Sequence, residues 1–189
     1  KKYKHLIVSP HYSQNALIKM IDNEVENHKA GLPSGINLKL NAITNFSLIE
    51  KLYQASNAGV SIQMIIRGIC CLIPGIKGMS ENIKVISIVD KFLEHPRIYQ
   101  FKNAGDPKVY ISSADFMTRN IENRVEVAVP IYDPRLKRQI NDVLNIIWKD
   151  NVKARIINEF NQNKFFKNKS KPIRSQFEIY KYYKNEASI

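Results

Sequence analysis

The sequence predicts an α/β fold, a mixed sheet flanked by helices, and three observations support this prediction. The first third of the chain alternates between short apolar runs and stretches with apolar residues at helical spacing, a β-α-β-α-β pattern typical of a mostly parallel sheet. Residues 97–132 then contain several short alternating runs close together in the sequence, which favours a more antiparallel part of the sheet. A further helical pattern follows Asp133-Pro134.

The first strand and the first helix are expected before the turn at residue 31. HLIVS (5–9) is typical of a short buried strand that ends at Pro10. The hydroxyl of Ser13 is expected to cap the helix that follows. The apolar positions of this helix have the spacing of one helical face and are Leu17, Ile18, Ile21 and Val25.

The next two strands are expected to enclose a second helix. The turn GLPSG (31–35) ends the first helix and leads into INLKLNAI (36–43), which alternates as a strand does. Thr44 is expected to open a helix over residues 46–56, and Asn57-Ala58-Gly59 to end it. VSIQMIIRG (60–68) is rich in β-branched residues and predicts another strand.

The remaining chain predicts a long loop, several strands and two helices. The loop CCLIPGIKGMSEN (70–82) has a length at which loops are often functional. One helix begins at Asp133-Pro134, and a last amphipathic helix covers residues 175–185. We expect one compact domain over residues 1–189, with the basic segment and terminal helix in 164–189. The expected strands are 97–101, 108–113 and 124–132, and residues 83–89 are expected to form a strand or an extended segment.

Composition restricts the function classes. The chain has 29 Lys and Arg against 17 Asp and Glu, a formal net charge of +12, which favours an anionic partner such as nucleic acid, an anionic membrane or a polyanionic substrate. A solubilising surface with a basic tail is the other interpretation. No apolar run reaches the length of about 18 residues that a membrane helix needs. The chain begins without Met and close to a strand, so we expect it to be a piece of a longer protein.

The cysteines argue for a reducing compartment. Cys70 and Cys71 are adjacent, which disfavours a disulfide between them and does not match a CxxC metal site. A cytoplasmic location fits this cysteine usage.

Arg67 is the first candidate binding residue, because it ends a predicted strand and is followed by Gly68. Ligands of open α/β sheets bind beyond the carboxyl ends of the strands. A guanidinium there can contact two phosphate oxygens, and a glycine allows a ligand to approach the backbone. A plain surface arginine remains the alternative.

His95 is the second candidate, because Arg97 lies one strand period away on the same face. A histidine that transfers protons near neutral pH, together with hydroxyls and cations, suits phosphoryl transfer. A histidine before a proline can equally be an ordinary loop residue. The polar side chains that follow in the same segment are Lys108, Tyr110, Ser112, Arg119, Asn120 and Arg124.

Other chemistries lack their sequence patterns. The chain contains no GxxxxGK[ST], GxGxxG, GxSxG or HExxH motif. Glu122 and Glu126 would be about 13 Å apart on a strand, too far for the acid and base of one glycosidic bond.

Two long strings carry a family resemblance. RGICCLIPGIKGMSENIKVISIVDKFLEHPRIYQF and KVYISSADFMTRNIENRVEVAVPIYDPRLK strongly resemble the C-terminal region of bacterial polyphosphate kinases, and the similarity extends from HLIVSP to DNVKARI. The resemblance implies a phospholipase D-like fold, in which two similar α/β halves share an active site and this chain is one half.

The phospholipase D pattern has His-x-Lys, then Gly-Ser-x-Asn, then a downstream acid. By resemblance, His95-Pro96-Arg97 matches the first part, Ser112-Ser113-Ala114-Asp115 the second and Glu126 the third. Arg97 stands where the pattern has Lys, and Asp115 where it has Asn. Both departures keep the site polar but alter how a phosphate is held, because Arg is a planar fork and Lys a point charge.

The resemblance also implies a reaction, the reversible transfer of the ATP γ-phosphate to long-chain inorganic polyphosphate through a phosphohistidine. The phosphorylated histidine and the arginines that contact Mg²⁺ are expected in the preceding half, outside this chain, and no metal ligand is expected here. His95, Arg67 and Arg124 are expected to contact the phosphates of ATP, with His95 as catalytic acid, base or donor. The wall of the site would be formed by Arg97, Lys108, Ser112, Ser113, Asp115, Arg119 and Glu126.

The implied partners are ATP or ADP, inorganic polyphosphate, the other domains of the parent chain and further copies in a homo-oligomer, without a specific nucleic acid. The isolated piece is expected to be inactive and the parent enzyme cytoplasmic, with peripheral membrane association as an option. Two other classes stay open. One is a basic nucleic-acid-binding module, suggested by the net charge and the aromatic residues; the other is a phospholipase D-type phosphodiesterase.

Overall fold

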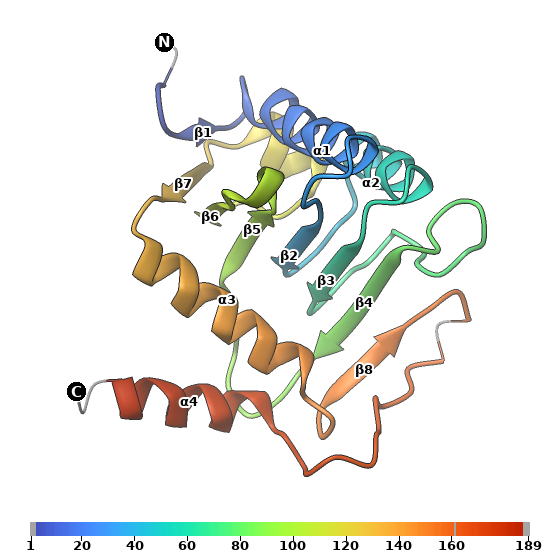
Figure 1. Ribbon diagram of the computed structural model, residues 1–189, viewed down its shortest axis with the longest axis vertical. Coiled ribbons are helices and arrows are strands. Elements are labelled where there is room, and N and C mark those ends of the chain that lie inside the picture. The colour runs from blue at the N-terminus through green and yellow to red at the C-terminus, as the bar shows by residue number, and fades with distance from the viewer. Residues whose placement is uncertain (1–2, 161, 187–189) are drawn as a thin grey trace.

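The structure is a computed structural model that describes residues 3–160 and 162–186. Figure 1 shows a twisted central sheet with helices on both of its faces. The sheet is 8-stranded, in the order β1-β7-β6-β5-β2-β3-β4-β8. The predicted α/β class with a mixed sheet is therefore confirmed.

The predicted parallel part of the sheet is present at its centre. β2 pairs with β3, and β3 with β4, in parallel register. The strands and the helices that connect them are α1 (Ser13–Lys29), β2 (Ile36–Leu40), α2 (Phe46–Asn57), β3 (Ile62–Ile66) and β4 (Ile83–Ile88).

The predicted antiparallel part lies on the other side of β2. β5 pairs antiparallel with β2, and β6, β7 and β1 follow in antiparallel order. These strands are β1 (Ile7–Val8), β5 (Arg97–Phe101), β6 (Lys108–Ser112) and β7 (Val127–Ile131), with the 3₁₀ turn η1 (Asn103–Gly105) between β5 and β6.

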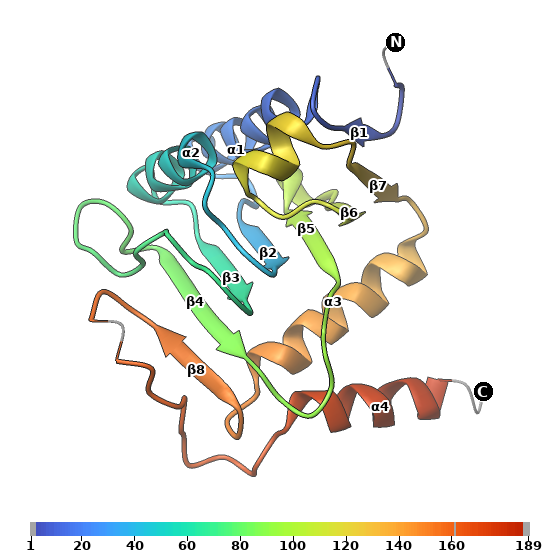
Figure 2. The ribbon, with the colours of Figure 1, turned by 180° about the vertical axis from the view of Figure 1, so that it is seen from behind.

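The core is divided into two layers by the sheet. Along β3, Ile62, Met64 and Ile66 pack into the cluster formed with α1 and α2. Ile65 points to the opposite face and packs with Leu144 and Ile147 of α3 (Pro134–Trp148). Because successive side chains of a strand face opposite sides, the apolar run of β3 serves both layers. The helix α4 (Ser175–Glu186) lies beside α3, as Figures 1 and 2 show.

At the N-termini of the helices, one expected capping residue is confirmed and two are corrected. Asp133 caps α3, since its carboxylate accepts hydrogen bonds from the backbone N–H groups of Arg135 and Leu136. The cap of α2 is Asn45 and not Thr44, because the Asn45 side chain accepts from Leu48 N–H. Ser13 is already the first residue of α1, and its hydroxyl donates to Ile121 O instead of capping the helix.

A strand and a helical turn were not predicted, and several strands are shorter than predicted; β2, for example, ends at Leu40 and not at residue 43. β8 (Ala154–Ile157) pairs antiparallel with β4 at the end of the sheet. A π-helical turn, η2 (Arg119–Asn123), precedes β7, so the strand expected over residues 124–132 begins only at Val127. Among the described residues, no helix combines the length and the apolarity that crossing a membrane would require.

Candidate functional site

The strand registers bring most of the predicted residues to one end of the sheet, which we call the site end. β2 and β3 finish there, β5 and β7 begin there, and β6 finishes there, since Arg97 pairs with Ser112 and Ser112 with Ala128. Lys108 is not brought to this end. It pairs with Phe101, four residues away from Ser112 along β6, which is about 13 Å at about 3.3 Å per residue.

Asp115 is the most constrained acid at the site end. Its buried carboxylate accepts hydrogen bonds from Arg97 Nη2 (2.8 Å), from Asn41 N–H (2.7 Å) and from Ala42 N–H (3.2 Å). Burial by itself would raise the pKa of Asp115, but the hydrogen bonds from Arg97 and these amides hold the pKa below its ordinary value. Asp115 is therefore an ionised partner for Arg97.

Arg97 links Asp115 to His95. Its Nη1 lies 2.9 Å from His95 Nδ1 and also donates to the His95 carbonyl oxygen at 3.2 Å. The Arg97 side chain is 11% exposed, whereas the His95 ring is open to solvent. The two residues are thus in contact, as their spacing in the sequence suggested.

Asn41 completes a chain of hydrogen bonds that runs from Arg67 to His95. Its Oδ1 accepts from Arg67 Nε at 3.0 Å, while its own N–H donates to Asp115. Arg67 and His95 are thereby connected through Asn41, Asp115 and Arg97. The terminal amino groups of Arg67 make no hydrogen bond with any residue that the structure describes.

Sequence reasoning missed Asn41, although its place directly after the alternating run INLKL of β2 was a usable signal. Sequence analysis also expected Gly68 to let a ligand approach the backbone, whereas in the structure it is another segment of the chain that approaches. Gly68 N–H donates to Asn41 O at 2.7 Å, and a Cβ on Gly68 would lie 3.0 Å from that oxygen. The glycine therefore allows two segments of the chain to meet.

Glu126 organises a second group of polar residues at the site end. It accepts hydrogen bonds from the Ser113 hydroxyl and from Asn120 Nδ2, the latter at 2.5 Å. Ser112 behaves differently, because it is buried and its hydroxyl accepts from Tyr99 at 2.9 Å. Of the two serines matched to the phospholipase D pattern, Ser113 therefore contacts the matched acid and Ser112 supports the core.

Arg119 and Arg124 lie in the connection between β6 and β7. Both side chains are exposed, and neither makes a hydrogen bond or an ion pair within residues 3–160 and 162–186. Arg124 stands two residues before Glu126. With Arg67, these guanidinium groups supply positive charge that is not neutralised by a described carboxylate, an arrangement suited to binding phosphate oxygens.

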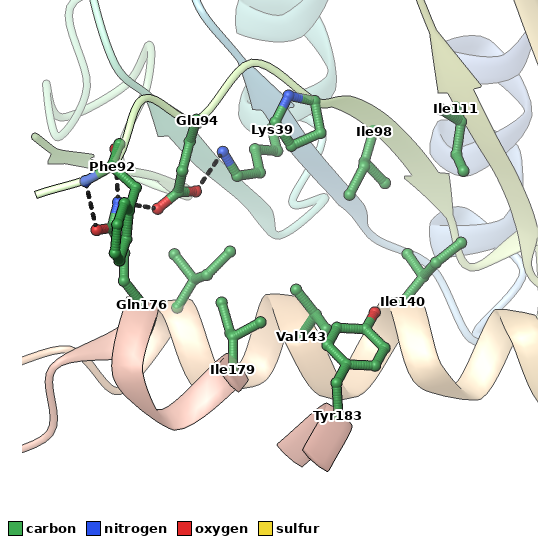
Figure 3. A pocket seen from close by; sticks show the side chains of 12 residues that line it. Lys39, Phe92, Glu94, Ile98, Ile111, Ile140, Val143, Gln176, Ile179 and Tyr183 are labelled. Atoms are coloured by element: carbon green, nitrogen blue, oxygen red, sulfur yellow. Dashed lines mark hydrogen bonds and ion pairs between the residues drawn. The ribbon is translucent and has the colours of Figure 1, made fainter. Parts of the chain in front are cut away.

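The loop between β4 and β5 (residues 89–96) carries His95 and is held by residues that sequence analysis did not select. Glu94 forms an ion pair with Lys39 at 3.0 Å and accepts a hydrogen bond from Gln176 Nε2 at 2.9 Å. Figure 3 shows these contacts as dashed lines. Gln176 also contacts the backbone N–H and carbonyl of Phe92. A largely apolar cavity of about 410 Å³ lies between this loop, the sheet, α3 and α4.

Side chains of the types that can bind metal ions do not cluster in the described part of the chain. Within the described residues, no group of three or more His, Cys, Asp or Glu could hold a metal ion. Cys70 and Cys71 are free thiols, and burial raises the pKa of Cys70 to about 11, so that thiol is protonated at neutral pH.

Comparisons with solved structures locate the fold. A crystal structure of polyphosphate kinase from Porphyromonas gingivalis superposes with a TM-score of 0.94 at 43% identity, covering 98% of this chain and 28% of that one. A phospholipase D family member, Nuc from Salmonella typhimurium, superposes with a TM-score of 0.59 at 15% identity, covering 82% of this chain and 97% of that one. The phospholipase D-like fold is thus confirmed.

Curated relatives identify the family. A polyphosphate kinase of Vibrio parahaemolyticus is 54% identical over 185 residues, which are 97% of this chain and 27% of that protein. The polyphosphate kinase of Escherichia coli K12 is 48% identical over 184 residues, again 97% of this chain and 27% of that protein. The chain therefore spans about a quarter of the length of these relatives. The family described as "Polyphosphate kinase C-terminal domain 2" matches residues 6–176, and the chain belongs to this family.

Proposed function

We propose that this chain is the C-terminal catalytic region of a longer polyphosphate kinase, which reversibly transfers the γ-phosphate of ATP to long-chain inorganic polyphosphate. In this proposal a phosphohistidine carried by the preceding region accepts the phosphate, and His95 faces that histidine across the shared site. The support is family membership, together with the share of the curated relatives that the chain spans.

The observation that carries the proposal is the continuous link from Arg67 to His95. The hydrogen bonds through Asn41, Asp115 and Arg97 hold two groups at the same end of the sheet. One is an exposed imidazole, and the other is an arginine whose terminal amino groups have no hydrogen-bond partner in the part of the chain that the structure describes. Phosphoryl transfer depends mainly on such positioning and on charge neutralisation. Arg67 and Arg124 would neutralise the phosphates of ATP, and His95 would contact the group in transfer.

The remaining partners of the proposed enzyme follow from the same assignment. Mg²⁺ would accompany ATP, but the described residues contain no cluster that fits it, so its ligands would lie in the rest of the parent enzyme. We propose the other domains and further copies of the parent chain as protein partners. Peripheral membrane association and a cytoplasmic location belong to the same proposal.

The test is a His95→Ala substitution in the parent enzyme, with polyphosphate synthesis from ATP as the measurement. Synthesis should fall at least about a hundredfold, in the range of removing one transition-state donor. His28→Ala is the matched control, because His28 contacts Ser34, just before the start of β2 and away from the site end. Near-normal synthesis by His95→Ala would remove His95 from the site.

The isolated chain provides a second test. It should bind ATP or polyphosphate weakly and make no polymer, because the phosphorylated histidine would be missing. Robust synthesis by residues 1–189 alone would contradict the proposed division between two regions.

A further inference from the structure

We propose that Arg97 is a positioning residue that fixes the neutral His95 ring in its Nε2–H tautomer. His95 would then act as a hydrogen-bond donor and neither as a nucleophile nor as a proton acceptor. The identity of the group that accepts this hydrogen bond, a transferring phosphoryl group, rests on the proposed function. The tautomer itself rests only on contacts within this chain.

The tautomer follows from the chemistry of the contact between the two side chains. A guanidinium group carries N–H donors and has no acceptor. Because Arg97 Nη1 lies 2.9 Å from His95 Nδ1, that ring nitrogen must accept the hydrogen bond through its lone pair. The single proton of the neutral ring is therefore on Nε2, the nitrogen on the other side of the ring.

The donor orientation of Arg97 is itself imposed by the fold. Arg97 Nη2 is held at 2.8 Å by Asp115, whose side chain is 7% exposed, and Asp115 is in turn fixed by the backbone amides of Asn41 and Ala42. Nη1 is further fixed by the His95 carbonyl oxygen. Arg97 thus directs both terminal amino groups at protein atoms, unlike a phosphate-binding cation.

This arrangement restricts what His95 can do. A second proton would have to enter at Nδ1, where it would face an N–H of a cation, so the Arg97 contact is compatible only with the neutral ring. Loss of the Nε2 proton would leave an imidazolate, and nucleophilic attack would need a bare nitrogen that points to the substrate. What remains is donation from Nε2–H to an oxygen that gains negative charge, with no bond made or broken at His95.

The contacts that hold the loop carrying His95 support the same conclusion. The residue before His95, Glu94, is tied to Lys39 and Gln176, so the loop is fixed on the side away from Arg97. A histidine that must present one defined nitrogen benefits from being held on both sides.

The tautomer can be read directly in this chain by ¹⁵N NMR of labelled histidines above pH 8, with a His95→Gln sample to assign the signal. We expect a proton on Nε2 and a bare Nδ1 for His95. In Arg97→Met, which keeps the length of the side chain without its donors, the two tautomers should mix. A proton on Nδ1 of wild-type His95 would overturn the inference, and this reading needs no enzymatic activity.

Activity gives an independent reading in the parent enzyme, where His95→Gln and His95→Asn are compared. The amide nitrogen of Gln reaches the place of Nε2, whereas that of Asn reaches the place of Nδ1 and would face the Arg97 donor. We expect kcat of His95→Gln to exceed that of His95→Asn at least tenfold, with similar KM for ATP. Equal or reversed values would overturn the inference. Absence of polyphosphate synthesis by the wild-type parent enzyme would instead overturn the proposed function, leaving the tautomer to the NMR reading.

Discussion

Gly68 determines at the residue scale how closely the start of the loop after β3 can approach Asn41, the residue directly after β2. A Cβ at this position would lie 3.0 Å from Asn41 O, and the same oxygen accepts the Gly68 N–H at 2.7 Å. Asn41 cannot move without disturbing Asp115 and Arg67, which it holds.

Gly68→Ala should therefore destabilise the chain by about 1–3 kcal/mol, the usual range for overpacking. The free energy of unfolding is measured by denaturant titration. Cys71→Ala is the control, because Cys71 is exposed in the same loop and its truncation should change stability by less than about 0.5 kcal/mol. An unchanged stability of Gly68→Ala would mean that the Asn41 backbone adapts without cost.

Buried carboxylates predict an acid sensitivity. A hydrogen bond from Arg174 holds the pKa of Asp90 below its ordinary value of 3.8, and the pKa of Asp115 and Asp150 is also lowered because their hydrogen bonds outweigh the effect of burial. A depressed folded-state pKa stabilises the fold above pH 3.8, and this stability is lost as the pH falls through the folded value.

The melting temperature should therefore be similar at pH 7 and pH 5 and fall clearly at pH 3. Thermal unfolding followed by circular dichroism checks this. Asp150→Asn provides the comparison, since its side chain no longer titrates and part of the acid effect should disappear. A melting temperature at pH 3 equal to that at pH 5 would contradict the assignment of these pKa shifts.

At the scale of elements, residues at the start of α4 hold the loop that carries His95 through hydrogen bonds. Arg174 makes two hydrogen bonds to Asp90, at 2.8 and 2.6 Å, and Gln176 contacts both Phe92 and Glu94. Figure 2 shows this loop passing close to the beginning of α4. The terminal helix thus has a positioning role, although it contributes no residue to the hydrogen-bond chain between Arg67 and His95.

Gln176→Ala should loosen this loop without unfolding the chain. The Phe92 amide, which donates to Gln176 Oε1 at 2.9 Å, should exchange with solvent at least about tenfold faster, a loss of about 1.4 kcal/mol of local protection and in the range of one hydrogen bond. Hydrogen exchange followed by NMR measures this. Lys181→Ala, which alters only an exposed pair with Glu178, should leave the Phe92 exchange rate unchanged. Unchanged exchange in Gln176→Ala would show that the loop is held by other contacts.

The elements also show what sequence patterns can and cannot predict. β3 was predicted well because β-branched residues and a closing glycine mark it locally. β8 was missed because it has four residues and is defined by its pairing with β4. Period-two alternation correctly separated the faces of β6 but could not say which end of the strand meets His95, so Lys108 was grouped with the site although it lies at the far end. Asn41 and Gln176 reach their partners only through tertiary structure.

At the scale of the whole molecule, the helices cover both faces of the sheet, so a ligand can approach its strands at their ends. The hydrogen-bond chain from Arg67 to His95 lies at such an end, and Arg119 and Arg124 add exposed charge nearby. The net charge of +12 raises the local concentration of any polyanion, but it does not by itself distinguish polyphosphate from nucleic acid.

A competition titration makes that distinction. Polyphosphate should displace labelled single-stranded DNA of equal charge from the chain, because the guanidinium groups at the site end match closely spaced phosphate oxygens. Binding of both polymers should weaken as salt rises, since both release counterions. Arg67→Gln should reduce the preference for polyphosphate, whereas Lys29→Gln, at the end of α1 and paired with Glu26, should not. DNA binding at least as tight as polyphosphate binding would favour the nucleic-acid module, because the charge would then act as an unspecific surface and not through the site end.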